Sequence, residues 1–233
     1  ETLGGATVIC TDKTGTITEN KMSLQAVYAF PSDQLFEDGN WDIEAQKVIE
    51  TAMWASEPIP FDPMEKTLHH EYKKRTKSDE RHLFSMVHEY PLDGKPPMMT
   101  HIFQNKEGKR IIAAKGGAEA ILKVSNLSDE EKTRIHNIIN SIASKGHRIL
   151  GVGYSDFEGT DFPKIQQHIQ FNFVGLIVFY DPPKENIQHV IKQFYDAGIQ
   201  VKVITGDNSA TTKAIAEKAG IKNATTAIEG HEI

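Results

Sequence analysis

The chain shows the pattern of a parallel α/β sheet at its two ends and a different pattern between them. Residues 5–12 are small, β-branched and nearly uncharged, which is typical of a short buried strand that ends at Asp12. From Lys184 onward the pattern is helix, then strand (200–205), then helix (210–219). Because both ends suit one parallel sheet, we expect an α/β domain formed by the two ends of the chain and interrupted by an inserted domain.

The middle of the chain predicts an α+β domain with an antiparallel sheet. An amphipathic helix is expected near 42–56. Ser128 and Glu131 form a capping box at the start of a second helix, which stops at Gly146. Strand-like runs alternate with turns in this region. The expected strands are 84–90, 98–104, 110–115, 149–154 and 171–179.

Charge and residue usage exclude several classes of protein. The 26 basic and 32 acidic residues give a formal net charge of -6 without a basic stripe, so we expect no nucleic-acid partner. A single cysteine, Cys10, can build neither a disulfide framework nor a zinc site, and its apolar neighbours predict that it packs in the core. The ten histidines show no helical ligand pair beside a carboxylate, so we expect them at the surface.

The longest strongly apolar stretch, residues 171–180, is about half of the roughly 20 residues that a membrane-spanning helix needs. We therefore expect no membrane segment in this sequence. The chain begins with Glu1 rather than Met and has no signal-peptide pattern, which favours a fragment of a longer protein.

Asp12 and the residues after it suit phosphoryl chemistry. A carboxylate at the carboxyl end of a parallel strand lies where ligands bind in open α/β sheets. Asp12 can act as a nucleophile that forms an acyl phosphate, and the backbone amides from Lys13 to Thr16 can cradle the transferred oxygens. The run Thr205-Gly206-Asp207 ends the second expected parallel strand, so its hydroxyl and amides are predicted beside Asp12.

The motifs of the chain resemble those of the P-type cation-transporting ATPases, which belong to the haloacid-dehalogenase-like superfamily. The resemblance covers nearly the whole chain and favours the calcium-pump-like branch. The matching blocks are Asp12-Lys13-Thr14-Gly15-Thr16-Ile17-Thr18, Asp62-Pro63-Met64-Glu65, Lys115-Gly116-Gly117-Ala118-Glu119, Gly146-His147-Arg148, Asp181-Pro182-Pro183-Lys184 and Thr205-Gly206-Asp207.

This resemblance implies a domain organisation and a cellular setting. Residues 1–21 and 182–233 match a partial Rossmann-type phosphorylation domain, and 22–181 match the inserted nucleotide-binding domain. The implied protein is the head of a membrane ion pump on the cytoplasmic face, with ATP and Mg²⁺ as cofactors. The implied partners are the transported cation, of Ca²⁺ type, and the actuator and transmembrane domains of the same full-length chain.

The resemblance also implies roles for individual residues. Asp12, Lys13, Thr14, Thr205, Gly206 and Asp207 form the expected catalytic set. Glu65, Tyr90, Lys95, Lys115, Gly116 and Arg148 form the expected nucleotide-binding set. In that set Glu65 approaches the purine amino group, Tyr90 stacks on adenine, and Lys115 and Arg148 approach the phosphates. Oxygens of Asp12 and Thr14 are the expected Mg²⁺ ligands. Later magnesium-binding blocks of the family are not in the sequence, so we expect it to bind nucleotide without phosphorylating itself.

Two other functions fit parts of the sequence. A phosphatase of the same superfamily with a large cap usually has a second Asp two residues after the nucleophile, as general acid and base. Thr14 occupies that position, which disfavours the phosphatase. A nucleotide-binding module without catalysis is the second alternative, and the complete motif around Asp12 argues against it for the parent protein.

Overall fold

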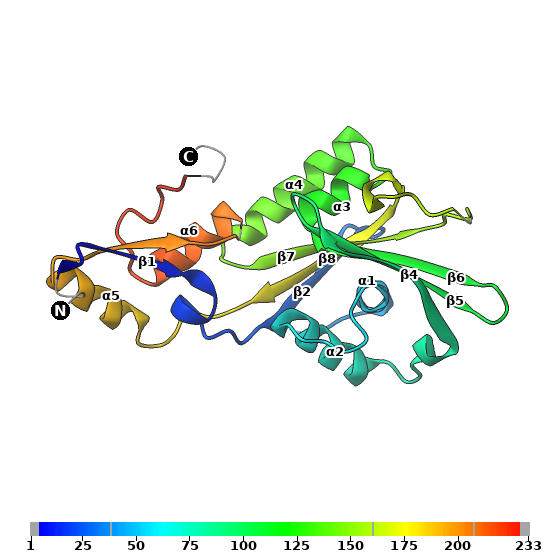
Figure 1. The fold of residues 1–233 in the computed structure, drawn as a ribbon, viewed down its shortest axis with the longest axis horizontal. Coiled ribbons are helices and arrows are strands. Elements are labelled where there is room, and N and C mark those ends of the chain that lie inside the picture. Colours follow the sequence, from blue (N-terminus) through cyan, green and yellow to red (C-terminus); the bar gives the residue numbers. More distant parts are fainter. Residues whose placement is uncertain (1–4, 38, 160, 207, 229–233) are drawn as a thin grey trace. The chain divides into compact units, whose positions relative to one another are not determined.

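The computed structural model describes residues 5–37, 39–159, 161–206 and 208–228. It divides the chain into two compact units (Figure 1). The first unit contains Glu1–Met22, Asn140–Arg148 and Tyr180–Ile233, and the second contains Ser23–Ile139 and Ile149–Phe179. None of the described helices is both long and apolar enough to cross a bilayer.

The second unit is built on a seven-stranded sheet with the strand order β3-β2-β8-β7-β6-β5-β4. Its strand pairs β2–β3, β4–β5, β5–β6 and β6–β7 are antiparallel, which confirms the predicted antiparallel sheet. Gly94 and Gly108 have positive φ in the two hairpin turns, where residues with a side chain are strained. The strands are β2 (Ser23–Ala29), β3 (Gln34–Glu37), β4 (Phe84–Asp93), β5 (Met98–Asn105), β6 (Arg110–Gly117), β7 (Arg148–Ser155) and β8 (Asn172–Tyr180).

Helices cover both faces of this sheet. Helices α1 (Ile43–Trp54) and α2 (Pro63–Arg75) lie on one face, and α3 (Ala118–Val124) and α4 (Asp129–Ala143) lie on the other (Figure 1). We call these the α1–α2 face and the α3–α4 face. The main apolar core lies on the α3–α4 face, where side chains of β5 and β6 pack on Ile121 of α3 and on Ile135 and Ile139 of α4.

The first unit has a two-stranded parallel sheet in which β1 (Val8–Asp12) pairs with β9 (Gln200–Ile204). Helices α5 (Ile187–Asp196) and α6 (Ser209–Lys218) bury their apolar side chains with the sheet and with Ile17. This arrangement confirms the predicted helix–strand–helix pattern and the pairing of the two ends of the chain.

Three expectations about burial and helices are wrong. Strand β1 is not buried, and Cys10 is exposed, because β9 is the only described strand that pairs with β1. Not all histidines lie at the surface, since His69 and His101 are buried in the second unit. The sequence reading also missed α2, because that helix is too polar to show a strong apolar face.

Gly175 offers a direct test of the sheet. A Cβ at this position on β8 would lie 2.0 Å from the backbone oxygen of Tyr28 on β2, so alanine must push the two strands apart. We expect Gly175→Ala to lower the free energy of unfolding by ~3 kcal/mol, the upper end of the usual cost of overpacking. Chemical denaturation measures this change. Gly5→Ala is the control, because a Cβ there meets nothing within 4 Å. Equal stability of the two variants would contradict the β2–β8 packing.

Candidate functional site

Asp12 lies at the carboxyl end of β1, where its side chain is exposed. Its Oδ1 accepts a hydrogen bond of 2.7 Å from the backbone N–H of Lys13. In the parallel ladder Asp12 is paired with Ile204, so Thr205 and Gly206 follow β9 at the same sheet edge. The structure therefore brings Asp12, Lys13, Thr14, Thr205 and Gly206 to one place, as predicted. Asp207 lies outside the described residues.

Hydrogen bonds to Asp181 fix the loop after Asp12. Oδ2 of the buried Asp181 accepts a bond of 2.5 Å from the Thr18 hydroxyl, and Oδ1 accepts one of 3.0 Å from the backbone N–H of Lys21. The Thr18 hydroxyl accepts in turn from the N–H of Gly15, which has a φ of 76°. The ammonium of Lys184 donates a hydrogen bond of 2.8 Å to the Gly15 carbonyl. Asp181 and Lys184 thus connect the segment after β8 to the loop after Asp12.

Asp12 and Thr14 supply only part of a Mg²⁺ shell. An exposed carboxylate and a backbone carbonyl are oxygen ligands of the type that Mg²⁺ prefers. Two ligands are typical of sites where water and substrate phosphate complete the octahedral coordination. The residues therefore fit Mg²⁺ that arrives with a nucleotide better than a permanent metal centre.

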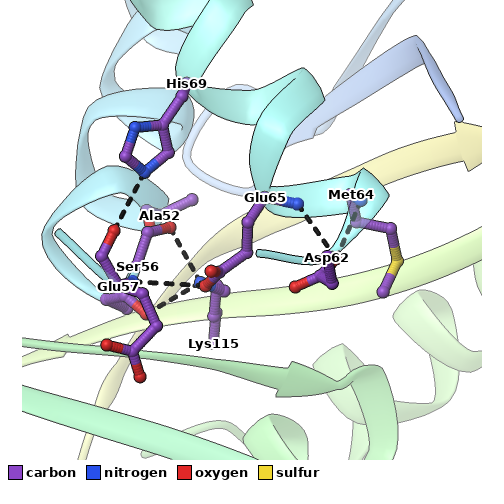
Figure 2. Close-up of polar contacts among 9 residues, drawn as sticks. Ala52, Ser56, Glu57, Asp62, Met64, Glu65, His69 and Lys115 are labelled. Atoms are coloured by element: carbon purple, nitrogen blue, oxygen red, sulfur yellow. Dashed lines mark hydrogen bonds and ion pairs between the residues drawn. The ribbon is translucent and has the colours of Figure 1, made fainter. Parts of the chain in front are cut away.

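The second cluster surrounds Lys115 on the α1–α2 face (Figure 2). The ammonium of Lys115 donates to Oε1 of Glu65 at 2.6 Å, to Oγ of Ser56 at 2.7 Å and to the carbonyl of Ala55 at 2.9 Å. Lys115 and Glu65 are both buried. The cluster thus joins β6, the end of α1 and the first turn of α2.

The contacts of Lys115 use all three of its N–H donors, so none is left for a phosphate in this arrangement. Burial lowers the pKa of Lys115, and the charge of Glu65 opposes this effect. Oε1 of Glu65 accepts from Lys115 and from the backbone N–H of Glu57, whereas Oε2 is buried without a partner among the described residues. The cluster therefore presents an acceptor, Oε2, rather than a free cation.

Tyr90 lies on the opposite face of the sheet from Lys115. It pairs across β5 and β6 with Thr100 and Ala114, and side chains alternate between faces, so Tyr90 points to the α3–α4 face. There its ring is buried in the core and its hydroxyl donates to the carbonyl of Pro163. The structure does not bring Tyr90 together with Lys115 and Glu65.

Leu92, two residues later on β4, occupies the α1–α2 face instead. Asp93 pairs with Met98, whose side chain packs in the core of the α3–α4 face, so the neighbouring Leu92 points the other way. Residues two apart on a regular strand point to the same face. Tyr90 and Leu92 point to opposite faces because the pairing of β4 with β5 is irregular between Tyr90 and Asp93. Leu92 is 62% exposed.

The remaining expected nucleotide residues are more scattered. Lys95 is exposed in the β4–β5 turn. At Gly116 the packing leaves no room for a side chain. A Cβ there would lie 2.5 Å from Cα of Met98 and 2.5 Å from the carbonyl oxygen of Pro97. Arg148 is the first residue of β7, but its backbone is grouped with the first unit, whereas the others belong to the second.

Asp62 shows how the sequence could have revealed α2. It caps the helix by accepting from the N–H groups of Met64 and Glu65, with Pro63 in the first turn (Figure 2). Asp followed by Pro and then Glu is a known start signal for helices. That signal positions Glu65 in the first turn, where its carboxylate reaches Lys115.

Comparison with known proteins assigns the family. The family described as "P-type ATPase, cytoplasmic domain N" matches residues 62–186, which is more than half of the chain. The chain belongs to the P-type ATPases. The matched range contains the Lys115–Glu65 cluster and ends just after Asp181.

Curated P-type ATPases are similar over almost the whole chain. A calcium-transporting ATPase of Bacillus subtilis is 27% identical over 93% of this chain, and calcium-transporting ATPase 1 of Saccharomyces cerevisiae is 28% identical over 95%. A sodium/potassium-exporting P-type ATPase of Schizosaccharomyces pombe is also 28% identical over 95%. The chain spans only 29%, 28% and 27% of the length of these three P-type ATPases.

The buried pair of this P-type ATPase chain gives a stability prediction. Glu65→Gln removes the negative charge and leaves the ammonium of Lys115 buried without a counter-ion. We expect a loss of ~3 kcal/mol in the free energy of unfolding, typical of breaking one side of a buried pair. Urea denaturation measures it.

Two further variants isolate the pair. Glu107→Gln changes an exposed carboxylate in the β5–β6 turn, so its stability should stay within about 0.5 kcal/mol of the unaltered chain. The double variant Lys115→Met/Glu65→Gln should lose less stability than Glu65→Gln alone, because no charge then remains buried. Additive losses would show that the two charges do not interact.

Proposed function

We propose that this chain is the ATP-binding and phosphorylation head of a membrane pump that couples ATP hydrolysis to cation transport, through an aspartyl phosphate at Asp12. The observation that carries this proposal is the position of Asp12, exposed at the carboxyl end of β1 and in register with the last residue of β9. Membership in the P-type ATPases and the similarity to calcium-transporting ATPases support it.

The proposed reaction uses the carboxylate of Asp12 as the nucleophile. An Oδ atom forms a bond to the γ-phosphorus of ATP, the bond from phosphorus to the bridging oxygen breaks, and ADP leaves. Mg²⁺, held by Asp12 and the Thr14 carbonyl, would neutralise phosphate charge. Thr205, Gly206 and the backbone after Lys13 are proposed to hold the transferred phosphoryl oxygens.

Thr14 is proposed to protect the intermediate. A threonine cannot act as the general base that a carboxylate supplies at this position in phosphatases. Water attack on the acyl phosphate is then slow, which gives a pump time to change conformation. This absence of a base is the reason to prefer a pump over a phosphatase with a large cap.

For the nucleotide, we infer a site on the α1–α2 face. Oε2 of Glu65 is a buried acceptor without a partner among the described residues, and a purine amino group is a matching donor. Exposed apolar side chains on β4 and in the loop between α1 and α2 suit contact with a base. They are Leu92, Ile59 and Phe61, which are 62%, 85% and 75% exposed. Lys95, exposed in the β4–β5 turn of the same unit, is the proposed residue for the phosphates.

The domain roles follow the same proposal. Residues 1–21 and 182–233 would form part of the phosphorylation domain, and 22–181 the nucleotide-binding domain. The transmembrane domain of the full-length pump would supply the path of the cation. The actuator domain would also belong to that full-length chain. Calcium is the cation we favour, since two of the three relatives named above are calcium-transporting ATPases.

A nucleotide titration tests the inferred base site. We expect Leu92→Ser to weaken ATP binding about 10-fold, because the loss of roughly 60 Å² of apolar contact costs about 1.4 kcal/mol. Leu83→Ser, a change at an exposed leucine just before β4, should bind ATP like the unaltered chain. Isothermal titration calorimetry gives both affinities. If Leu92→Ser were neutral and Tyr90→Phe weakened binding instead, the base would lie on the α3–α4 face.

A labelling experiment tests whether this chain can phosphorylate itself on Asp12. With γ-labelled ATP and Mg²⁺ we expect bound nucleotide but no hydroxylamine-labile label on Asp12, because two oxygen ligands hold Mg²⁺ weakly. The control is Asp12→Asn, which should show the same background. A label that appears in the unaltered chain and disappears in Asp12→Asn would contradict the prediction, and would show that these residues suffice for phosphoryl transfer.

A further inference from the structure

Three side chains with metal-ligating atoms converge on the α1–α2 face. Glu57 follows α1, Glu89 is on β4 and His101 is on β5, directly opposite Glu89 in the ladder. One ligand atom from each lies within 4.8 Å of the other two. The Glu57 carboxylate takes no part in the contacts drawn around Lys115 in Figure 2. The two carboxylates and the imidazole therefore form a cluster of their own beside the Lys115–Glu65 pair, to which the bond from the backbone N–H of Glu57 to Oε1 of Glu65 connects it.

His101 is the member of the cluster that most needs a partner. Its side chain is 0% exposed, and neither ring nitrogen has a hydrogen-bond partner among the residues that the structure describes. The backbone of Trp54 and Ser56 lies near enough to raise its pKa, without reaching hydrogen-bond geometry. An unpaired buried polar group costs about 1–3 kcal/mol. A metal ion that binds the lone pair of one ring nitrogen would remove the cost at that nitrogen.

We propose that Glu57, Glu89 and His101 bind a divalent transition-metal ion such as Zn²⁺. The charges agree with this assignment, because Lys115 and Glu65 neutralise each other and the two remaining carboxylates carry two negative charges. The carboxylates of Glu57 and Glu89 lie close together, and a bound cation would relieve the repulsion between them. A neutral imidazole has a lone pair on one ring nitrogen that can bind a metal.

The ligand types select the class of metal. Ca²⁺ and Mg²⁺ prefer oxygen ligands alone, whereas imidazole together with carboxylates suits Zn²⁺ and its first-row neighbours. Ligand atoms of a tetrahedral Zn²⁺ site lie about 3.4 Å apart, given bonds of about 2.1 Å. Glu89 is exposed and free to rotate by the small distance that this requires. Three protein ligands leave a fourth position open to water or to a substrate group.

This site is independent of the proposed pump function. Any Mg²⁺ that accompanies ATP to Asp12 is bound by residues of the first unit, whereas all three ligands proposed here belong to the second unit. A chain that does not bind ATP would therefore still have this metal site. A chain that does not bind the metal would still have Asp12 and Thr14.

Calorimetric titration with Zn²⁺ tests the proposal on the whole 233-residue chain. Every protein carries Cys10→Ser, because the exposed thiol of Cys10 could bind zinc itself. We expect one Zn²⁺ per chain, and we expect Glu57→Gln and Glu89→Gln each to weaken binding on the order of 100-fold. Glu107→Gln, the matched change at an exposed carboxylate outside the cluster, should leave the affinity unchanged.

Cobalt gives a second readout that depends on His101. Co²⁺ bound at a tetrahedral nitrogen and oxygen site absorbs visible light strongly, and His101→Phe should remove that absorption. Because His101 is buried, the exposed Glu89→Gln variant keeps the test valid if His101→Phe does not fold. Failure of the chain that carries Cys10→Ser alone to bind Zn²⁺ more tightly than roughly 100 μM would overturn the proposal. Equal affinity in Glu89→Gln, or equally tight binding of Mg²⁺ at the same residues, would also overturn it.

Discussion

The buried ion pair of Lys115 and Glu65 is the interaction on which the α1–α2 face depends. A charged ammonium inside a protein is costly unless its donors are satisfied, and here each of the three donors has an acceptor. The acceptors come from the end of α1 and the start of α2, so the pair determines where both helices sit on β6. Such a pair adds little net stability, but it excludes other packings in which the charge would stay unpaired.

In the first unit, Asp181 is the buried charged residue whose hydrogen bonds connect separate segments of the chain. Its two carboxylate oxygens accept from the Thr18 hydroxyl and the Lys21 amide, and the backbone N–H of Lys184 donates to the carbonyl of Ile17. These bonds connect the loop after Asp12 to the segment after β8, more than 160 residues later in the sequence. Asp12 can therefore be exposed and still have a defined backbone beside it, which suits the role of nucleophile proposed for it.

Much of this arrangement could be predicted from the sequence, because it depends on local patterns. The two parallel strands, the hairpin strands and the capping box of α4 follow from side-chain periodicity and turn residues, and the structure confirms each of them. The position of Asp12 beside Thr205 could also be predicted, since parallel strands end at the same edge. Local patterns thus sufficed for the elements and for the edge where Asp12 lies.

The faces of the sheet could not be predicted in the same way. Tyr90 and Leu92 point to opposite faces because the ladder of β4 is irregular between Tyr90 and Asp93, and a register shift leaves no mark in composition. The exposure of Cys10 depends on how many strands pair with β1, which is a property of the whole sheet. The cluster of Glu57, Glu89 and His101 joins a loop to two strands, so no sequence spacing reveals it.

Two of the unsatisfied groups on the α1–α2 face, among the residues that the structure describes, differ in chemistry. Oε2 of Glu65 is an acceptor that needs a hydrogen donor, whereas the neutral ring of His101 has a lone pair that suits a metal ion. The two proposals assign a different ligand to each group, a purine amino group to Oε2 of Glu65 and a metal ion to the imidazole of His101. Each unpaired group costs about 1–3 kcal/mol, which a purely structural face would avoid by using apolar side chains. The unpaired polar atoms at these two positions therefore favour ligand binding over packing as the explanation of the face.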